Sequence, residues 1–178
     1  RLNEVKKILP NMKEIIKRLQ KEYKFIDIKI ITIPYLHKFI NDAVKDLRVD
    51  VIFEKNEKLF YMKSSFLAIA ASGTVSLELA FYKIPMIVVY NANILTSFII
   101  NRFVKVKWAC LINIIFNKEI IPEFLFKDYQ SEKVFEKIED FLDNEKSTSF
   151  QLNYFNKLPD IFLNKKNDPS FLASKIIL

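Results

Sequence analysis

Glycine is almost absent from this chain, which has one in 178 residues, Gly73. Average usage of about 7 % would give roughly a dozen. In a chain with so little glycine, we expect the one that remains to be needed for a backbone reason. The missing Cβ lets the chain turn sharply and lets a ligand approach the main chain. Gly73 is therefore the first candidate for a binding position.

Cysteine and histidine are just as scarce, with one of each, Cys110 and His37. A single cysteine excludes an internal disulfide bond and favours a reducing compartment. One cysteine and one histidine also disfavour a zinc site and a Cys/His nucleophile pair.

Long hydrophobic runs are missing too. Half of the residues are hydrophobic (51%), yet no uninterrupted run approaches the roughly 20 apolar residues of a membrane-spanning helix. This composition favours a soluble or peripheral protein. The net charge of +7 favours an anionic partner. No basic tract is interleaved with stacking aromatic residues, so we do not expect nucleic acid to be that partner.

What the chain does contain is an alternation of short apolar runs and amphipathic stretches, which predicts a parallel sheet covered by helices on both faces. The expected fold is an α/β, Rossmann-like, doubly wound domain over residues 1–178, with extra helices at the C-terminal end. Pro10 is expected to kink the first helix or to start a second one. The predicted strands are 26–33, 51–53, 66–70 and 86–90; the predicted helices are 2–19, 35–47, 58–64, 74–83, 94–106, 131–142, 149–156 and 169–178; the segment 111–125 is predicted to be irregular.

Gly73 lies between the predicted strand 66–70 and the predicted helix 74–83. The N-terminus of a helix carries free N–H groups and a partial positive charge, so this turn suits a phosphate. The alternative is that Ser72 or Thr74 merely caps the helix. Glu78, about one turn further on, can accept two ribose hydroxyls, or it can simply complement the helix dipole.

The predicted helix 94–106 has apolar residues next to basic ones and is followed by Lys107 and Trp108. Such a stripe either packs against the sheet or lies on a membrane surface, and both interpretations stay open.

A succession of motifs resembles the lipid-A-disaccharide synthase family of GT-B glycosyltransferases. The order and spacing agree over about residues 66–126, and the opening helix with Leu9-Pro10 also agrees. The motifs that carry the resemblance are Ala71-Ser72-Gly73-Thr74 with Leu77-Glu78, Pro85-Met86-Ile87-Val88-Val89-Tyr90, Leu95-Thr96, Arg102-Phe103-Val104-Lys105, Leu111-Ile112-Asn113 and Pro122-Glu123-Phe124-Leu125.

The resemblance implies that the chain is the C-terminal, UDP-sugar-binding half of such an enzyme, with its N-terminal partner domain absent. Arg1 then occupies the arginine of a family turn that precedes the opening helix. The UDP-binding residues implied in this way are Arg1, Ser72, Gly73 and Thr74 for the diphosphate, Glu78 for the ribose, and Asn113 as the loop residue that faces the nucleotide. No cofactor and no metal are expected, because the sequence has no Asp-x-Asp-type cluster.

The implied reaction is an inverting transfer of 2,3-diacylglucosamine from UDP to 2,3-diacylglucosamine 1-phosphate in lipid A biosynthesis. The catalytic base is expected on the missing N-terminal domain, so this chain alone is expected to be inactive. The implied location is the cytoplasm of a Gram-negative bacterium, with contact to the inner-membrane surface as an open alternative. Two other functions also stay open: another GT-B UDP-sugar enzyme (an epimerase or a muramyl-pathway transferase), and a non-catalytic nucleotide-binding or membrane-interaction domain.

Three positions depart from the family pattern. The loop proline is replaced by Ile112, and Asn91 stands where a basic residue is common. Asn117 replaces a glycine, a mild change because asparagine tolerates a positive φ.

Overall fold

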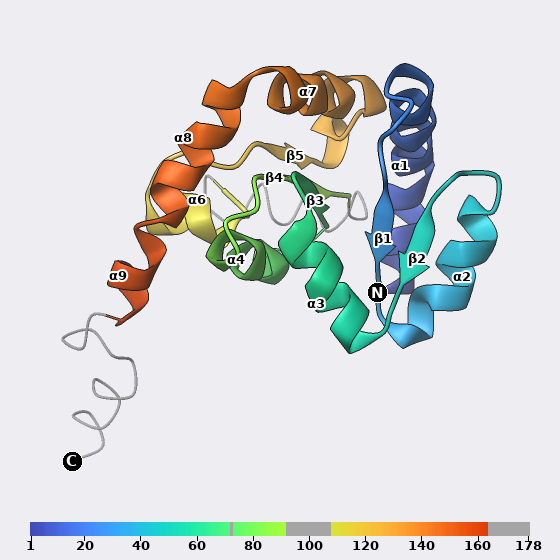
Figure 1. Cartoon of the computed structure of the whole chain (residues 1–178), viewed down its shortest axis with the longest axis horizontal. Coiled ribbons are helices and arrows are strands. Elements are labelled where there is room, and N and C mark those ends of the chain that lie inside the picture. The colour runs from blue at the N-terminus through green and yellow to red at the C-terminus, as the bar shows by residue number, and fades with distance from the viewer. Residues whose placement is uncertain (72, 92–107, 164–178) are drawn as a thin grey trace, which may run out of the picture.

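The computed structural model of the chain describes residues 1–71, 73–91 and 108–163 (Figure 1). The predicted helices 94–106 and 169–178 lie outside the described residues. No helix of the described part is long and apolar enough to span a bilayer.

The described strands all run parallel and form two hydrogen-bonded groups. One group pairs β1 (Lys29–Ile31) with β2 (Asp50–Ile52). The other has the order β3 (Ala68–Ala70), β4 (Met86–Tyr90) and β5 (Glu123–Leu125). Because parallel strands are connected by crossovers, helices fall on both faces of such a sheet.

The helices follow the strands in alternation. Their bounds are α1 (Leu2–Glu22), α2 (Pro34–Val44), α3 (Lys55–Ser64), α4 (Gly73–Phe81), α6 (Leu111–Ile115), α7 (Ser131–Asp143), α8 (Glu145–Phe155) and α9 (Leu158–Leu163), with a short 3₁₀ turn η1 (Phe126–Asp128) after β5. The α8–α9 pair forms the extra helices at the C-terminal end of the described chain.

The central strand β4 is buried on both faces. Met86 and Val88 belong to a core cluster that includes residues of α4, α6 and α8. Ile87 and Val89 belong to a second cluster with residues of α1 and α7. In the view of Figure 1, α7 lies above β5 and α4 lies below β4. This two-sided burial confirms the α/β, doubly wound class that the sequence predicts.

Pro10 lies inside α1, which runs unbroken past it, so the alternative of a second helix starting there is wrong. Because proline lacks an N–H, the helix loses one i→i−4 hydrogen bond at this position. Two side chains from other elements bond to carbonyls of this turn. The hydroxyl of Tyr129 donates to Ile8 O at 2.7 Å, and the amide of Asn91 donates to Lys7 O at 3.5 Å.

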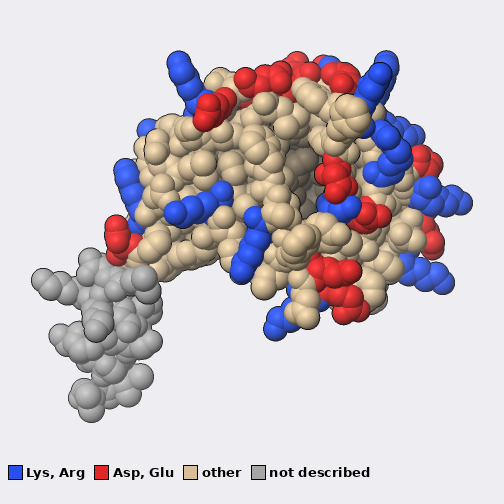
Figure 2. Space-filling view, viewed as in Figure 1, with Lys and Arg blue, Asp and Glu red and all other residues tan. Residues whose placement is uncertain are grey.

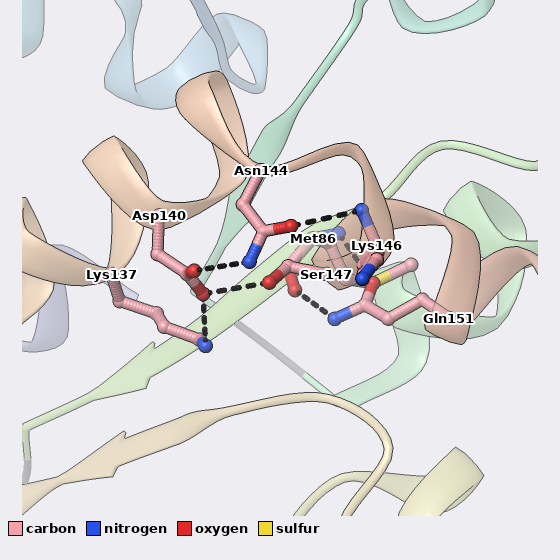
Figure 3. A network of polar contacts seen from close by, with 7 residues as sticks. All are labelled: Met86, Lys137, Asp140, Asn144, Lys146, Ser147 and Gln151. Atoms are coloured by element: carbon pink, nitrogen blue, oxygen red, sulfur yellow. Dashed lines mark hydrogen bonds and ion pairs between the residues drawn. The ribbon is translucent and has the colours of Figure 1, made fainter.

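The amino end of β4 is held by a buried glutamine (Figure 3). The Gln151 amide accepts from Met86 N and donates to Met86 O, each at 2.8 Å, so it imitates a neighbouring strand. Nearby, Asp140 accepts hydrogen bonds from Lys137, Asn144 and Ser147. These bonds fix the corner between α7 and α8 on the sheet.

The segment 111–125, predicted to be irregular, contains α6 and β5, so that prediction is wrong. Both elements are short, and β5 has no alternation of polar and apolar residues to signal it. The sequence prediction also missed α9. The remaining described α-helices and strands overlap their predicted ranges, α8 beginning four residues earlier than predicted, and β4 matches its predicted bounds.

The positive charge is not gathered into one stripe on the face seen in Figure 2. Acidic side chains line the top of this face, where α7 runs, and Lys and Arg side chains are scattered around it.

Candidate functional site

The turn between β3 and α4 lies at the carboxyl edge of the sheet, where ligands bind in open α/β folds. β3 ends at Ala70 and α4 begins at Gly73, while Ser72 lies outside the described residues. Gly73 has helical backbone, so a positive φ is not the reason for glycine here. The remaining reason for a glycine here is its lack of a Cβ at the first helical position. Without a Cβ, a ligand can approach the N–H groups at the start of α4.

Thr74 and Glu78 are both exposed on α4, whereas Ser76, Leu79 and Ala80 are buried. Positions i and i+4 of a helix lie on one face, so the threonine hydroxyl and the carboxylate share the solvent side of the first turns. The Glu78 side chain makes no hydrogen bond or ion pair with the described residues. Its carboxylate can therefore receive a ligand without breaking an existing contact.

Arg1 precedes α1, whose first turns reach the same edge. Asn91, which directly follows β4, bonds to Lys7 O, and Arg1 lies about 9 Å beyond Lys7 along the helix axis. The Arg1 side chain is 90% exposed and forms an ion pair of 3.7 Å with Glu4. The Arg1 guanidinium therefore lies largely in solvent, and its contact with a ligand at the glycine turn stays a prediction.

Asn113 is completely buried, unlike Arg1, Thr74 and Glu78, which are exposed. Its amide nitrogen donates to Ile121 O at 2.7 Å and to Glu123 Oε1 at 2.8 Å. Its oxygen accepts from Ile120 N at 2.8 Å and from Ile121 N at 2.9 Å. All of its donors and acceptors are engaged, so in this arrangement Asn113 fixes the loop between α6 and β5 and has no group left for a ligand.

Glu123 belongs to the motif Pro122-Glu123-Phe124-Leu125 of the family resemblance, which implies no role for it. In the structure its carboxylate accepts from Ala109 N at 2.7 Å, Cys110 N at 3.0 Å and the Asn113 amide. The available signal was a single acidic residue at the start of an apolar run, directly after Pro122. That signal is weak, because charged residues often flank a strand.

Two aromatic rings lie at the same edge. Tyr90 ends β4, and Phe126 follows β5 with φ of 54°. Their ring centroids are 5.8 Å apart in an edge-to-face arrangement. A bulky residue in the left-handed region is uncommon, and this one holds its ring against the end of the neighbouring strand. The sequence prediction placed Tyr90 at a strand end but found no role for Phe126.

A hollow of about 540 Å³ lies at the opposite, amino edge, between α7, α8 and the segment before β5. Its polar lining includes Lys137 and Ser147, which both bond to Asp140 (Figure 3). Lys137 and Ser147 already bond to Asp140, so they offer a ligand less than the exposed groups at the carboxyl edge do.

Comparisons with known proteins show to which family the chain is similar. Residues 1–175 match the family model described as Lipid-A-disaccharide synthetase. A lipid-A-disaccharide synthase of Rickettsia prowazekii is 32% identical over 179 residues, which cover 99% of this chain and 47% of that protein. The corresponding values for the enzyme of Bradyrhizobium diazoefficiens are 29% identity, 90% and 42%, and for that of Rickettsia bellii 37%, 81% and 38%.

The chain spans under half the length of these curated relatives. The match covers the described elements from α1 to α9, well beyond the motifs at residues 66–126. The resemblance found in the sequence is thereby confirmed, and the chain belongs to the lipid-A-disaccharide synthetase family.

Proposed function

We propose that this chain is the nucleotide-binding half of a lipid-A-disaccharide synthase, a hexosyltransferase. The proposed reaction transfers 2,3-diacylglucosamine from UDP to 2,3-diacylglucosamine 1-phosphate with inversion at the anomeric carbon. The observation that carries the proposal is the exposed pair Thr74 and Glu78 on the first turns of α4, directly after the glycine turn.

The proposed site binds the leaving group of the reaction. The N–H groups around Ser72, Gly73 and Thr74 hold the diphosphate, where the helix dipole favours negative charge. Arg1 adds a positive charge from α1, and Glu78 accepts the ribose hydroxyls. Asn113 contributes through the loop that it fixes and not through a direct contact.

Stabilising the negative charge of departing UDP lowers the barrier to breaking the bond between the sugar and the phosphate. The acceptor hydroxyl also needs a general base, which we assign to a partner domain outside this chain. The acylated substrates lead us to propose that the protein works at the cytoplasmic surface of the inner membrane.

Calorimetric titration with UDP, UMP and ADP tests the nucleotide site. We expect UDP to bind more tightly than ADP, and Glu78→Ala to weaken UDP binding about 10-fold or more, because it removes charge-assisted hydrogen bonds to the ligand. Glu136→Ala, which removes an exposed carboxylate from α7, is the matched control and should leave the affinity unchanged. Equal affinity for UDP and ADP, or equal effects of the two variants, would show that the assignment is wrong.

A further inference from the structure

The registers of β3, β4 and β5 place Glu123 level with the end of β3. Ala70 pairs with Val88, and Val88 pairs with Glu123, so the three residues form one row across the sheet. Neighbours in register point to the same face of a sheet. Ala70 and Val88 belong to the core beneath α4 and α6, so the Glu123 carboxylate lies on the face that these two helices cover.

Three donors converge on this carboxylate. Its Oε1 accepts from Cys110 N and from the Asn113 amide, and its Oε2 accepts from Ala109 N, all between 2.7 and 3.0 Å. Hydrogen bonds to an ionised acceptor are stronger than those between neutral groups. One side chain of β5 thus holds both the start of α6 and the buried asparagine of its loop.

The contacts continue from there to α4. The Cys110 thiol donates to the Ser76 hydroxyl at 3.3 Å, and both residues are completely buried. Ser76 lies on α4 three residues after Gly73. A continuous path therefore leads from Glu123 through Cys110 to the helix whose N-terminus forms the proposed phosphate site.

We propose that Glu123 is a positioning residue of the nucleotide site, holding the start of α6 against α4 so that the glycine turn keeps its binding geometry. This inference rests on the proposed function. A preorganised site binds more tightly because the ligand does not have to order it, so loosening the support lowers affinity without removing a ligand contact.

A graded pair of variants tests the proposal in UDP titrations of the whole chain. In Glu123→Gln one oxygen remains, and it can keep the two bonds to Cys110 and Asn113 while the bond to Ala109 is lost. Glu123→Ala loses all three. We expect the Kd for UDP to rise about 3-fold in Glu123→Gln and about 10- to 30-fold in Glu123→Ala, the range over which residues remote from a ligand modulate binding.

The control must separate positioning from a general loss of stability. Gln151→Leu removes two buried hydrogen bonds at the amino end of β4, away from the glycine turn. We expect it to lower the melting temperature at least as much as Glu123→Gln while changing the Kd for UDP less than 2-fold. Glu123→Gln can keep the bonds to Cys110 and Asn113. If Glu123→Ala does not fold, the UDP affinity of Glu123→Gln therefore tests the positioning role by itself.

The outcomes separate this inference from the function on which it rests. If the unaltered chain binds UDP and both Glu123 variants bind it equally well, Glu123 is structural only and the proposed function stands. If Gln151→Leu weakens UDP binding as much as Glu123→Gln does, positioning by Glu123 is likewise excluded. If the unaltered chain does not prefer UDP over ADP, the proposed function fails and the inference fails with it.

Discussion

At the scale of single residues, Lys83 follows the C-terminal end of α4 in a conformation that glycine usually adopts. Its φ is 59°, Ile84 N bonds to Leu79 O, and Lys83 N bonds to Ala80 O, which together make a Schellman motif. A side chain in the left-handed region costs about 1–2 kcal/mol, part of which is offset by the greater freedom of glycine in the unfolded chain. We therefore expect Lys83→Gly to raise the free energy of unfolding by about 0.5–1 kcal/mol, measured by urea denaturation.

The same motif closes α6 and supplies the comparison. Asn117 has φ of 47°, with Asn117 N bonded to Ile114 O and Lys118 N bonded to Asn113 O. Asparagine tolerates this conformation better than lysine does, so Asn117→Gly should gain less than Lys83→Gly. A gain at position 117 equal to or larger than that at 83 would contradict this account of the strain. The tolerance of Asn117 for positive φ, predicted from the sequence, is confirmed.

At the scale of elements, the corner between α7 and α8 depends on one carboxylate. The hydrogen bond from Lys137, with weaker contributions from Ser147 and Asn144, holds the pKa of Asp140 below its ordinary value. A depressed pKa in the folded state stabilises the fold above the ordinary pKa of the group, and this stabilisation is lost as the pH falls through the folded pKa. Asp140→Asn should therefore lower the free energy of unfolding at pH 7 by about 1 kcal/mol, a value reduced by the partial exposure of the group.

The pH dependence distinguishes this effect from a simple packing defect. Urea denaturation of both proteins from pH 7 to pH 2 should show the difference between them shrinking once the pH falls below about 4, where unfolded Asp begins to bind a proton. Glu136→Gln, exposed on the same helix, is the control and should show no such change. A constant difference at all pH values would mean that the Asp140 charge is not what stabilises the corner.

The elements also show how far sequence reasoning reaches. β4 could be predicted to the residue because five apolar residues follow Pro85 and are buried on both faces. β5 could not, because three residues that begin with Glu123 show neither alternation nor a hydrophobic run, and only pairing with β4 makes them a strand. Tertiary context decides such short elements.

In the candidate site, too, some features could be predicted from the sequence and others could not. Thr74 and Glu78 could be predicted as a pair because helical spacing alone puts them on one face. The burial of Asn113 and its bond to Glu123 could not, because they depend on the register that brings β5 beside β4. Spacing along the sequence predicts which residues of one helix or strand share a face. Contacts between different helices and strands depend on the folded structure.

At the scale of the whole molecule, the two core clusters lie on opposite faces of the same strand, β4. Neither cluster can lose its packing without exposing that strand, so we expect the chain to unfold in one cooperative transition. A single domain, as predicted from the sequence, would also unfold in one cooperative transition. Circular dichroism in urea and the exposure of a buried group should then report the same midpoint.

Cys110 is a natural probe of that transition. It is completely buried between α4 and α6, and burial raises the pKa of its thiol, so the folded chain presents neither access nor a thiolate to a reagent. Labelling should therefore require opening of the core, and the urea midpoint for rapid labelling should coincide with the midpoint from circular dichroism. A Ser64→Cys variant that also carries Cys110→Ala has its thiol at an exposed position of α3, and it should label rapidly without denaturant. If Cys110 labelled as rapidly as this control, or became reactive well below the midpoint from circular dichroism, the α4–α6 core would open independently of the second cluster and the single cooperative unit would be wrong.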